Sequence, residues 1–449
     1  MTKKYFSLQE VKQNIAIAIP VAISQLGHMA VAVADTIMAG NLGALPLAAA
    51  TLAISIFIPF MMISVGMSYG ITPMVAIADG ENNLPEIVKI LKNGFWLNMI
   101  MNFLLFIILL LLVQLLPIIN PNPEIVALAK PFFILQSLSL IPLSVFLIIK
   151  QFLEGLAITR VATMITIIAN VINIGLIIVF TQGFFQLPNL GLTGIAYATV
   201  IARLFMLIAI VFYFMVRPDF KVYRKHFQII KIEFKFIIHL FKNSIPIGLQ
   251  LMLESGAFGF AAIMAGWIGA KEIAAHQISL NIAAITYMAA TGIAAATTVR
   301  VGHEWGKKNY TMIRTAAFTA LLVVFIYELI SCLSFILFKD LLPLVYIREK
   351  IIVELSASLL MITALFQVSD GLQVVAMGAL RGIEDIRIPT IVAVIAYWLL
   401  GLPLGYFLAF KLHLGVQGIW YGLLAGLSIS AVLLCLRVHK KTSFLKRGL

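Results

Sequence analysis

The sequence predicts an all-α membrane protein with twelve transmembrane helices, arranged as two parallel six-helix bundles related by pseudo-two-fold symmetry. Three observations predict this fold. First, the 449 residues are 62% hydrophobic and only 11% charged, whereas roughly a quarter of a soluble domain is charged. Second, the apolar residues form twelve long runs, each about as long as a helix needs to cross a bilayer. Third, part of the first run returns about half a chain later.

Clusters of proline, glycine and charge separate the apolar runs, for example ADGENNLPE at 78–86 and PIINPNPE at 117–124. Two cysteines, Cys332 and Cys435, lie inside apolar runs and are interpreted as small buried hydrophobes rather than as a disulfide or metal framework. The twelve expected spans are 13–39, 46–76, 93–116, 127–150, 160–180, 192–215, 238–267, 276–299, 313–338, 351–380, 388–410 and 415–437.

An internal repeat relates the two halves of the chain. The letters IMAG occur at 37–40 and again at 263–266, and the same offset in numbering carries Pro20 onto Pro246. Six spans separate the copies, so both cross the membrane in the same direction. We therefore expect a first bundle over 1–216, a basic linker over 217–237 and a second bundle over 238–449. Transporters built from such repeats place substrate and ion sites near the midplane, where the bundles meet.

Charge sets the orientation. The chain carries a net charge of +13, but 25 of its 32 Lys and Arg residues fall on one side of the expected membrane. The positive-inside rule then predicts a protein of the inner membrane with both termini in the cytoplasm. Because the basic residues lie in loops rather than on a soluble face, no nucleic-acid partner is expected. The basic segment 217–236 fits either an amphipathic helix lying on anionic lipid head groups or a solvated linker.

Isolated acids within the spans are the candidate functional residues. Asp35, Glu254 and Asp370 lie deep in spans one, seven and ten, where a charged side chain costs roughly 2.5–3.5 kcal/mol on insertion scales. Glu254 falls opposite His28 in the repeat, so both halves carry a titratable group at the same depth. Glu328 and Arg203 are also deep, and are interpreted as structural partners or as residues at an interface or cavity edge.

Two kinds of chemistry fit such acids. A buried carboxylate can hold and release a proton, or it can join amide and hydroxyl oxygens in binding sodium at Glu254, Asp370 or Asp35. Asn170 and Asn173 are three residues apart on one helix face and offer neutral ligands in the first half. An apolar cavity with carboxylates also suits lipophilic, aromatic cations. The expected cavity residues are Gln25, His28, Gln250, Asn281 and Gln367.

These motifs resemble the multidrug and toxic compound extrusion (MATE) transporters. The resemblance rests on PVAISQ and ADTIMAGNLGALPLAA in span one, PIGLQLMLES and IMAGWIGAKEIAAHQISLN around span seven, and VRVGHEWGKKN at 299–309. It covers essentially the whole chain and is closest to the bacterial NorM-type branch, which carries acids in spans one, seven and ten together.

The resemblance implies an antiporter that exports cationic, often aromatic drugs against inward flow of sodium or protons. It makes Asp35 the cation residue of the first half and Glu254 and Asp370 the pair of the second half. Asn173 matches a span-five asparagine of the family. Asn170 departs from the pattern, because the related asparagines are four residues apart.

Other classes fit less well. A flippase of a lipid-linked precursor, from the same superfamily, is the alternative; it needs a basic cavity, whereas the deep charges here are mainly acidic. An enzyme needs a nucleophile and base or a metal-ligand cluster, and the histidines at 28, 276 and 303 are dispersed along the chain. We therefore expect a monomeric transporter, with no cofactor beyond the coupling ion.

Overall fold

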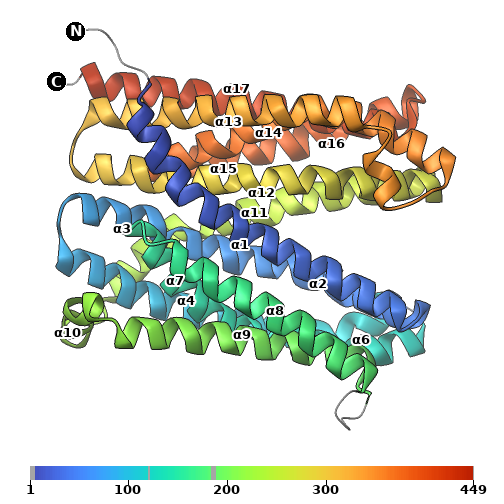
Figure 1. Cartoon of the computed structure of the whole chain (residues 1–449), viewed down its shortest axis with the longest axis horizontal. Helices are drawn as coiled ribbons and strands as arrows, with labels where there is room; N and C mark the ends of the chain where they lie inside the picture. The colour runs from blue at the N-terminus through green and yellow to red at the C-terminus, as the bar shows by residue number, and fades with distance from the viewer. Residues whose placement is uncertain (1–5, 120–121, 184–188, 448–449) are drawn as a thin grey trace. The chain divides into compact units, whose positions relative to one another are not determined.

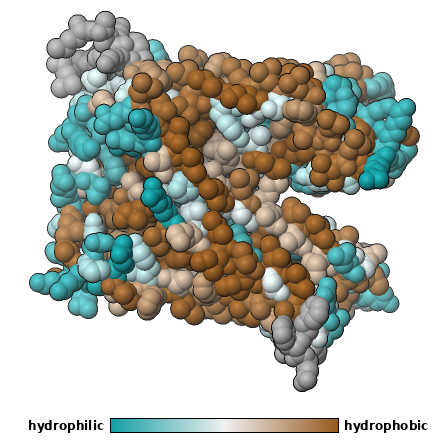
Figure 2. Space-filling model, viewed as in Figure 1, coloured by the Kyte–Doolittle hydropathy of each residue, from teal (hydrophilic) through white to brown (hydrophobic). Residues whose placement is uncertain are grey.

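The structure, a computed structural model, describes residues 6–119, 122–183 and 189–447, with side chains described up to residue 443. Every regular element in these ranges is a helix, and twelve of the helices found there are long and apolar enough to cross a membrane. Hydrophobic residues cover the long sides of the helices, and hydrophilic residues gather near the helix ends (Figure 2). The predicted all-α, twelve-span fold is confirmed. The two ends of the chain lie outside the described residues.

The helices extend the expected spans by a few residues at most ends. Their bounds are α1 (Leu8–Asn41), α2 (Ala44–Tyr69), α3 (Ile71–Gly80), α4 (Leu84–Leu112), α5 (Leu116–Ile119), α6 (Pro123–Leu138), α7 (Leu140–Gly155), α8 (Arg160–Gln182), α9 (Gly191–Val216), α10 (Lys221–Ile229), α11 (Phe234–Ile268), α12 (Ala270–Gly306), α13 (Tyr310–Phe338), α14 (Lys350–Gly382), α15 (Arg387–Val394), α16 (Leu402–Tyr406) and α17 (Gly415–Arg447). Two π-helical segments, η5 (Ile395–Gly401) and η6 (Phe407–Lys411), interrupt the eleventh span.

The contacts divide the chain into two compact units. The N unit is Ile23–Met252, and the C unit combines the residues up to Ala22 with those from Leu253 onward. Compared with the bundles expected from the sequence, the start of α1 therefore belongs to the second unit. The linker and the start of α11 belong to the first. The chain passes from one unit to the other within α1 and again within α11. In each helix the crossing comes a few residues after a proline, Pro20 in α1 and Pro246 in α11.

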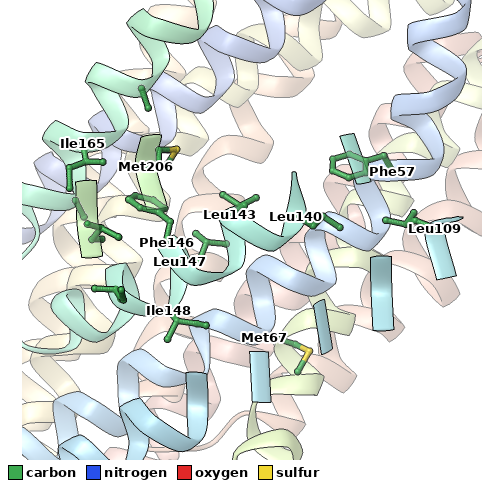
Figure 3. Packing of buried hydrophobic residues seen from close by; sticks show 14 of the residues in the cluster. Phe57, Met67, Leu109, Leu140, Leu143, Phe146, Leu147, Ile148, Ile165 and Met206 are labelled. Carbon is green, nitrogen blue, oxygen red and sulfur yellow. The ribbon is translucent and has the colours of Figure 1, made fainter. Parts of the chain in front are cut away.

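The N unit packs its helices around one apolar core. In Figure 1, α8 runs beside α9, and α2 runs beside α6. Figure 3 shows Leu143, Phe146 and Leu147 of α7 at the middle of this core, with Ile165 of α8 and Met206 of α9 close by. Phe146 is fully buried. Because such interiors are close-packed, these helices give the polar residues of the unit a fixed frame.

The C unit joins α12, α13, α14 and α17 side by side (Figure 1). The start of α1 packs into this unit through a bidentate ion pair. Arg300 of α12 donates to both carboxylate oxygens of Glu10, at 3.2 and 2.7 Å. Asn14 adds a hydrogen bond to Thr297 (3.4 Å). These contacts explain why the first turns of α1 group with α12 rather than with α2.

The sequence repeat returns as a repeat of local structure. Asn83 caps α4 by accepting from the amide of Glu86 (3.2 Å), and Asn309, its equivalent in the repeat, caps α13 by accepting from Met312 (3.3 Å). The residues just before these caps, Asn82 and Lys308, both adopt a positive φ, of 55° and 56°. Matching turns at equivalent positions indicate that each unit was built from the same helical plan.

The linker folds onto the N unit. Within it, α10 is held by Lys92 of α4, whose Nζ donates to the carbonyl of Phe227 (2.8 Å). Lys89 pairs with Glu233 at 3.0 Å, and the ring of Tyr223 packs edge-on against Phe152 of α7. These contacts attach the linker to α4 and α7, and whether its basic face lies on lipid or in solvent stays a prediction.

Candidate functional site

Asp35 lies on α1 in the N unit and keeps a buried carboxylate oxygen, Oδ1, without a hydrogen-bond partner among the described residues. Among the described residues, Asp35 also makes no ion pair. Arg203 of α9 is close enough to act on its charge. The Arg203 guanidinium itself donates to Ser139 (2.5 Å) and to Met61 (3.7 Å), and lies over the ring of Phe57. The expectation that Arg203 is a structural partner is consistent with these bonds.

The two asparagines of α8 lie differently from each other. Asn173 is buried and donates to Thr199 of α9 (3.4 Å), while its Oδ1 has no partner among the described residues. Asn170 lies directly against α1: a Cβ atom added at Gly27 would collide with its amide nitrogen. That nitrogen is buried and also lacks a partner in the described part of the chain. Together with Asp35 and the Ser24 hydroxyl, the described part of the N unit thus holds four unsatisfied polar atoms on α1 and α8.

His28 and Gln25 lie one turn apart on α1. Gln25 donates to the hydroxyl of Tyr69 on α2 (3.3 Å). His28 is under the influence of two positive groups, Lys150 of α7 and Arg203 of α9. Lys150 is buried and pairs with Glu154, one turn further along α7, at 3.6 Å. His28 is the repeat equivalent of Glu254, so this position has basic neighbours in the first half of the chain.

Glu254, on the part of α11 in the C unit, is held by two tyrosine hydroxyls. Tyr287 of α12 and Tyr397 of η5 both donate to its Oε1, at 3.3 and 3.4 Å. Gln373 of α14 in turn donates to the Tyr397 hydroxyl (2.6 Å). The π-helical turn η5 also carries Trp398, which donates to the carbonyl of Leu253 (2.9 Å). Such π segments often occur at functional sites.

Asp370 of α14 is close enough to Glu254 for the two carboxylates to act on each other's charge. It is 5% exposed, and its Oδ1 has no hydrogen-bond partner among the described residues. The structure therefore brings together the two acids of the second half, and both act on Tyr287 and Tyr397. Like charges at this range repel, so the group favours a bound cation or proton.

The remaining cavity candidates bond to the protein itself. Gln367 donates to the carbonyl of Ala283 (3.0 Å) and to the Thr286 hydroxyl, which ties α14 to α12. Asn281 accepts from Gln277, one turn before it on the surface of α12 (3.0 Å). Gln250 is buried in the N unit, near the end of its share of α11.

Sequence reasoning missed Tyr287, Tyr397 and Gln373. One signal was available: Gln373 lies three residues after Asp370, so the two share a face of α14. The tyrosines carry no such signal, because they come from helices far apart in the chain. Among the described residues, no group of three or more His, Cys, Asp and Glu side chains is placed to hold a metal ion. Sodium at Glu254, Asp370 or Asp35 stays a prediction.

Twelve apolar helices, a twofold internal repeat and buried acids in both units define a polytopic membrane protein of the repeat-transporter class. The MatE family model matches residues 20–179 and 246–407, one match in each half. The chain belongs to this family of multidrug efflux transporters, and the predicted resemblance is confirmed.

Named relatives agree over nearly the full length. The chain is 30% identical over 431 residues to the probable multidrug resistance protein NorM of Agrobacterium fabrum, covering 95% of this chain and 93% of that protein. It is 30% identical over 445 residues to the multidrug resistance protein NorM of Photobacterium profundum, covering 96% and 95%.

Solved structures share the fold. The crystal structure of the eukaryotic MATE transporter AtDTX14 matches with a TM-score of 0.87 over 98% of this chain and 99% of that chain, at 20% identity. The outward-facing conformation of a multidrug resistance MATE family transporter of the MOP superfamily matches with a TM-score of 0.86, over 98% and 97%, also at 20% identity.

Proposed function

We propose that the protein is a cation-coupled antiporter that exports lipophilic, cationic, often aromatic compounds by alternating access. Sodium or protons moving inward supply the energy. The observation that carries the proposal is the state of the acids: in the described part of the chain, Asp35 and Asp370 each keep a buried carboxylate oxygen with no partner. A buried polar group without a partner costs free energy. A mobile cation or proton that binds there would offset that cost.

The position of the acids suits an exchange of ligands. The Glu254 carboxylate accepts hydrogen bonds from neutral tyrosine hydroxyls, and these can adjust as a proton or cation arrives. A cationic drug would meet the same negative charge. Because ion and drug would compete for it, binding of one would favour release of the other, and the available energy is limited by their differential affinity for the two states.

We further propose an orientation and an assembly state. The chain lies in the cytoplasmic (inner) membrane with both termini in the cytoplasm, because most basic residues fall on that side. We propose that it acts as a monomer. It uses no cofactor beyond the coupling ion and is a transporter rather than an enzyme. The prolines near the two changes of unit, Pro20 and Pro246, are the proposed bend points.

The alternative, a flippase of a lipid-linked precursor, needs positive charge to hold a pyrophosphate. Basic residues do surround His28 in the N unit, but Lys150 there is paired with Glu154 and Arg203 is bonded to Ser139. The C unit instead gathers acids. We therefore favour a cationic substrate.

The test is efflux from lipid vesicles that contain the purified chain and a fluorescent, cationic aromatic dye. The dye is followed under a sodium gradient alone, a proton gradient alone, and no gradient. We expect efflux with at least one ion gradient and none without. Equal efflux under all three conditions would rule out cation coupling, and export of an anionic lipid analogue instead of the dye would favour the flippase.

A further inference from the structure

A third acid of the C unit, Glu328 on α13, is more deeply buried than the two predicted from the sequence. Its exposed fraction is 0%, and both carboxylate oxygens lack a hydrogen-bond partner among the described residues. The side chain lies against Gly371 of α14: a Cβ atom added there would be 2.5 Å from its Cγ and 2.9 Å from its Oε1. Gly371 directly follows Asp370, so the two carboxylates lie on facing helices next to each other.

The internal repeat places a neutral, hydrogen-bonded side chain at the position equivalent to Glu328. Glu328 follows the cap Asn309 at the same separation along the chain as Asn102 of α4 follows the cap Asn83. Asn102 is also buried, but its amide is satisfied: Ser64 of α2 donates to its Oδ1 (2.5 Å), and its Nδ2 donates to the carbonyl of Asn98 (2.9 Å).

The second half has lost that arrangement. The offset that carries Pro20 onto Pro246 also carries Ser64 onto Ala290, which has no hydroxyl, and Asn102 onto Glu328. A packing role would be served by the satisfied amide of the first half. An acid with no donor is the costlier choice, because a buried, unpartnered carboxylate loses its hydration without compensation.

The substitution belongs to a pattern. A slightly longer offset relates α7 to α14, since Gly155 lies against Val75 and Gly382 lies against Val301 in the same way. The offset from Gly155 to Gly382 also carries Leu143 onto Asp370. The C unit thus places acids at three positions where the N unit has groups that carry no negative charge: Glu254 for His28, Glu328 for Asn102 and Asp370 for Leu143.

The surroundings of Glu328 offer no positive charge. In the described part of the chain it makes no ion pair, and Asp370 is the charged group that acts on it from α14. On α13 itself, Tyr327 and Cys332 are the titratable neighbours. The Ser331 hydroxyl donates to the carbonyl of Tyr327 (3.2 Å) and lies close enough to Glu328 to act on its carboxylate as well. Tyr327 donates to the carbonyl of Thr286 on α12 (3.3 Å).

Asp370 in turn lies close enough to Glu254 for the two acids to act on each other's charge. Both Glu254 and Asp370 also act electrostatically on Tyr287 and Tyr397. A proton needs only one carboxylate oxygen, and it removes both the buried charge and the repulsion between neighbouring acids.

We propose that Glu328 and Asp370 form a proton-sharing pair, so that Glu328 is a third acid of the ion-coupling group of the C unit. The proton comes from water, bonds to a carboxyl oxygen of the pair and returns to water, with no other reactant. Because the two sites interact, they titrate as a pair rather than singly. The role in transport rests on the proposed function, whereas the bound proton does not.

The first test is infrared spectroscopy of the purified full chain in lipid at neutral pH. A protonated carboxylic acid has a carbonyl band that a carboxylate lacks. We expect Glu328→Gln to remove one such band from the wild-type spectrum, and Asp370→Asn to shift it. Ser334→Ala on the same helix should leave it unchanged, because the partly exposed Ser334 hydroxyl donates to the carbonyl of Ile330 (2.8 Å). Identical protonated-acid bands in wild type and Glu328→Gln would overturn the proposal.

The second test transplants the satisfied pair of the first half. The double substitution Glu328→Asn with Ala290→Ser reproduces the Asn102 and Ser64 arrangement in the C unit. We expect a Tm at least equal to that of the wild type, together with a shifted pH dependence of proton-driven dye efflux. Glu328→Asp should keep that dependence. A wild-type pH profile in both the double variant and Glu328→Gln would leave Glu328 without a coupling role.

The two proposals can fail separately. If the wild type exports no dye under any gradient, the proposed function fails, but the infrared comparison still decides whether Glu328 holds a proton. If the wild type exports dye and Glu328→Gln changes neither the spectrum nor the pH profile, only the inference about Glu328 is wrong.

Discussion

At the scale of single residues, buried polar groups are the informative feature. Asp35 and Asp370 each have a buried oxygen without a partner in the described residues, while Glu254 is held by Tyr287 and Tyr397. A hydrogen bond contributes about 1 kcal/mol net, but leaving a buried donor or acceptor unpaired costs about 1–3 kcal/mol. Each such group calls for an explanation, such as a bound water, a bound ion or stored strain.

Asp35→Asn should abolish ion-driven dye efflux and leave expression and folding largely intact. The substitution keeps the size of the side chain but removes the group that can take up a proton or cation. Efflux from reconstituted vesicles measures the effect. Thr36→Ala is the control, because the exposed Thr36 hydroxyl bonds only to the carbonyl of Ala32 one turn before it. Normal ion-driven export by Asp35→Asn would remove Asp35 from the mechanism.

Tyr397→Phe should lower the free energy of unfolding by about 1–3 kcal/mol, because it leaves the Gln373 amide unpaired and removes a donor to Glu254. Denaturant unfolding in detergent measures the difference. The control is Tyr406→Phe on α16, an exposed tyrosine whose hydroxyl makes no hydrogen bond within the described residues. Equal losses in the two variants would show that the Tyr397 hydroxyl is not a structural link.

At the scale of elements, close helix contacts position the acids. The pair α12 and α14 carries Tyr287, Asp370, Gln367 and Gln373, and it is tied by the Thr298 hydroxyl, which donates to the carbonyl of Gly378 (2.9 Å). In the N unit the equivalent Thr72 of α3 also bonds to α7, where it donates to the side-chain Oε1 of Gln151 (2.6 Å), with the carbonyl of Gln151 at 3.3 Å. The repeated tie sets the spacing of the helices in each unit.

Gly378→Val should lower Tm clearly, because a Cβ atom at this position would collide with the carbonyl of Ala294 on α12. Overpacking of this kind typically costs about 1–3 kcal/mol. Thermal unfolding of the purified protein checks it. Gly175→Ala on α8 is the control, since no atom beyond its own turn of helix lies within 4 Å of the added carbon, and it should be neutral or stabilising. A stable Gly378→Val variant would mean that α14 can move away from α12.

Several elements were predictable from the sequence and others were not. The twelve spans and the repeated caps at Asn83 and Asn309 follow from apolar run length and local hydrogen bonding, which a single sequence carries. The π-helical turn η5 and the transfer of the start of α1 to the C unit depend on tertiary contacts such as Glu10 with Arg300. No local pattern encodes those contacts.

The same limit applies to the candidate site. The acids stood out because charge is rare in the spans. Glu328 was interpreted as structural because it stands alone in its run. The proposed role of Glu328 rests on its contact with Gly371 on another helix. It also rests on the hydrogen-bonded Asn102 at the equivalent position of the first half.

At the scale of the whole molecule, two units built on one plan differ in charge. The N unit surrounds His28 with Lys150 and Arg203, whereas the C unit brings Glu254 and Asp370 together. Equivalent positions of the repeat are therefore surrounded by charges of opposite sign in the two units.

Glu254→Gln and Asp370→Asn should lower dye efflux non-additively, because the two acids act on each other. Coupling between interacting residues is typically about 0.5–3 kcal/mol. A double-mutant cycle on efflux rates measures it, and the double variant should be little worse than the poorer single variant. Independent, multiplicative losses would show that the two acids serve separate sites.

The most direct test of the central claim, that buried acids exchange the coupling ion for drug, is a reversed experiment. A gradient of cationic dye is imposed across vesicles, with no ion gradient, and the opposite movement of protons and of sodium is recorded. We predict dye-driven ion movement in the wild type and none in Asp35→Asn or in the Glu254→Gln, Asp370→Asn double variant. Dye flux without ion movement in the wild type, or undiminished ion movement in those variants, would contradict the account.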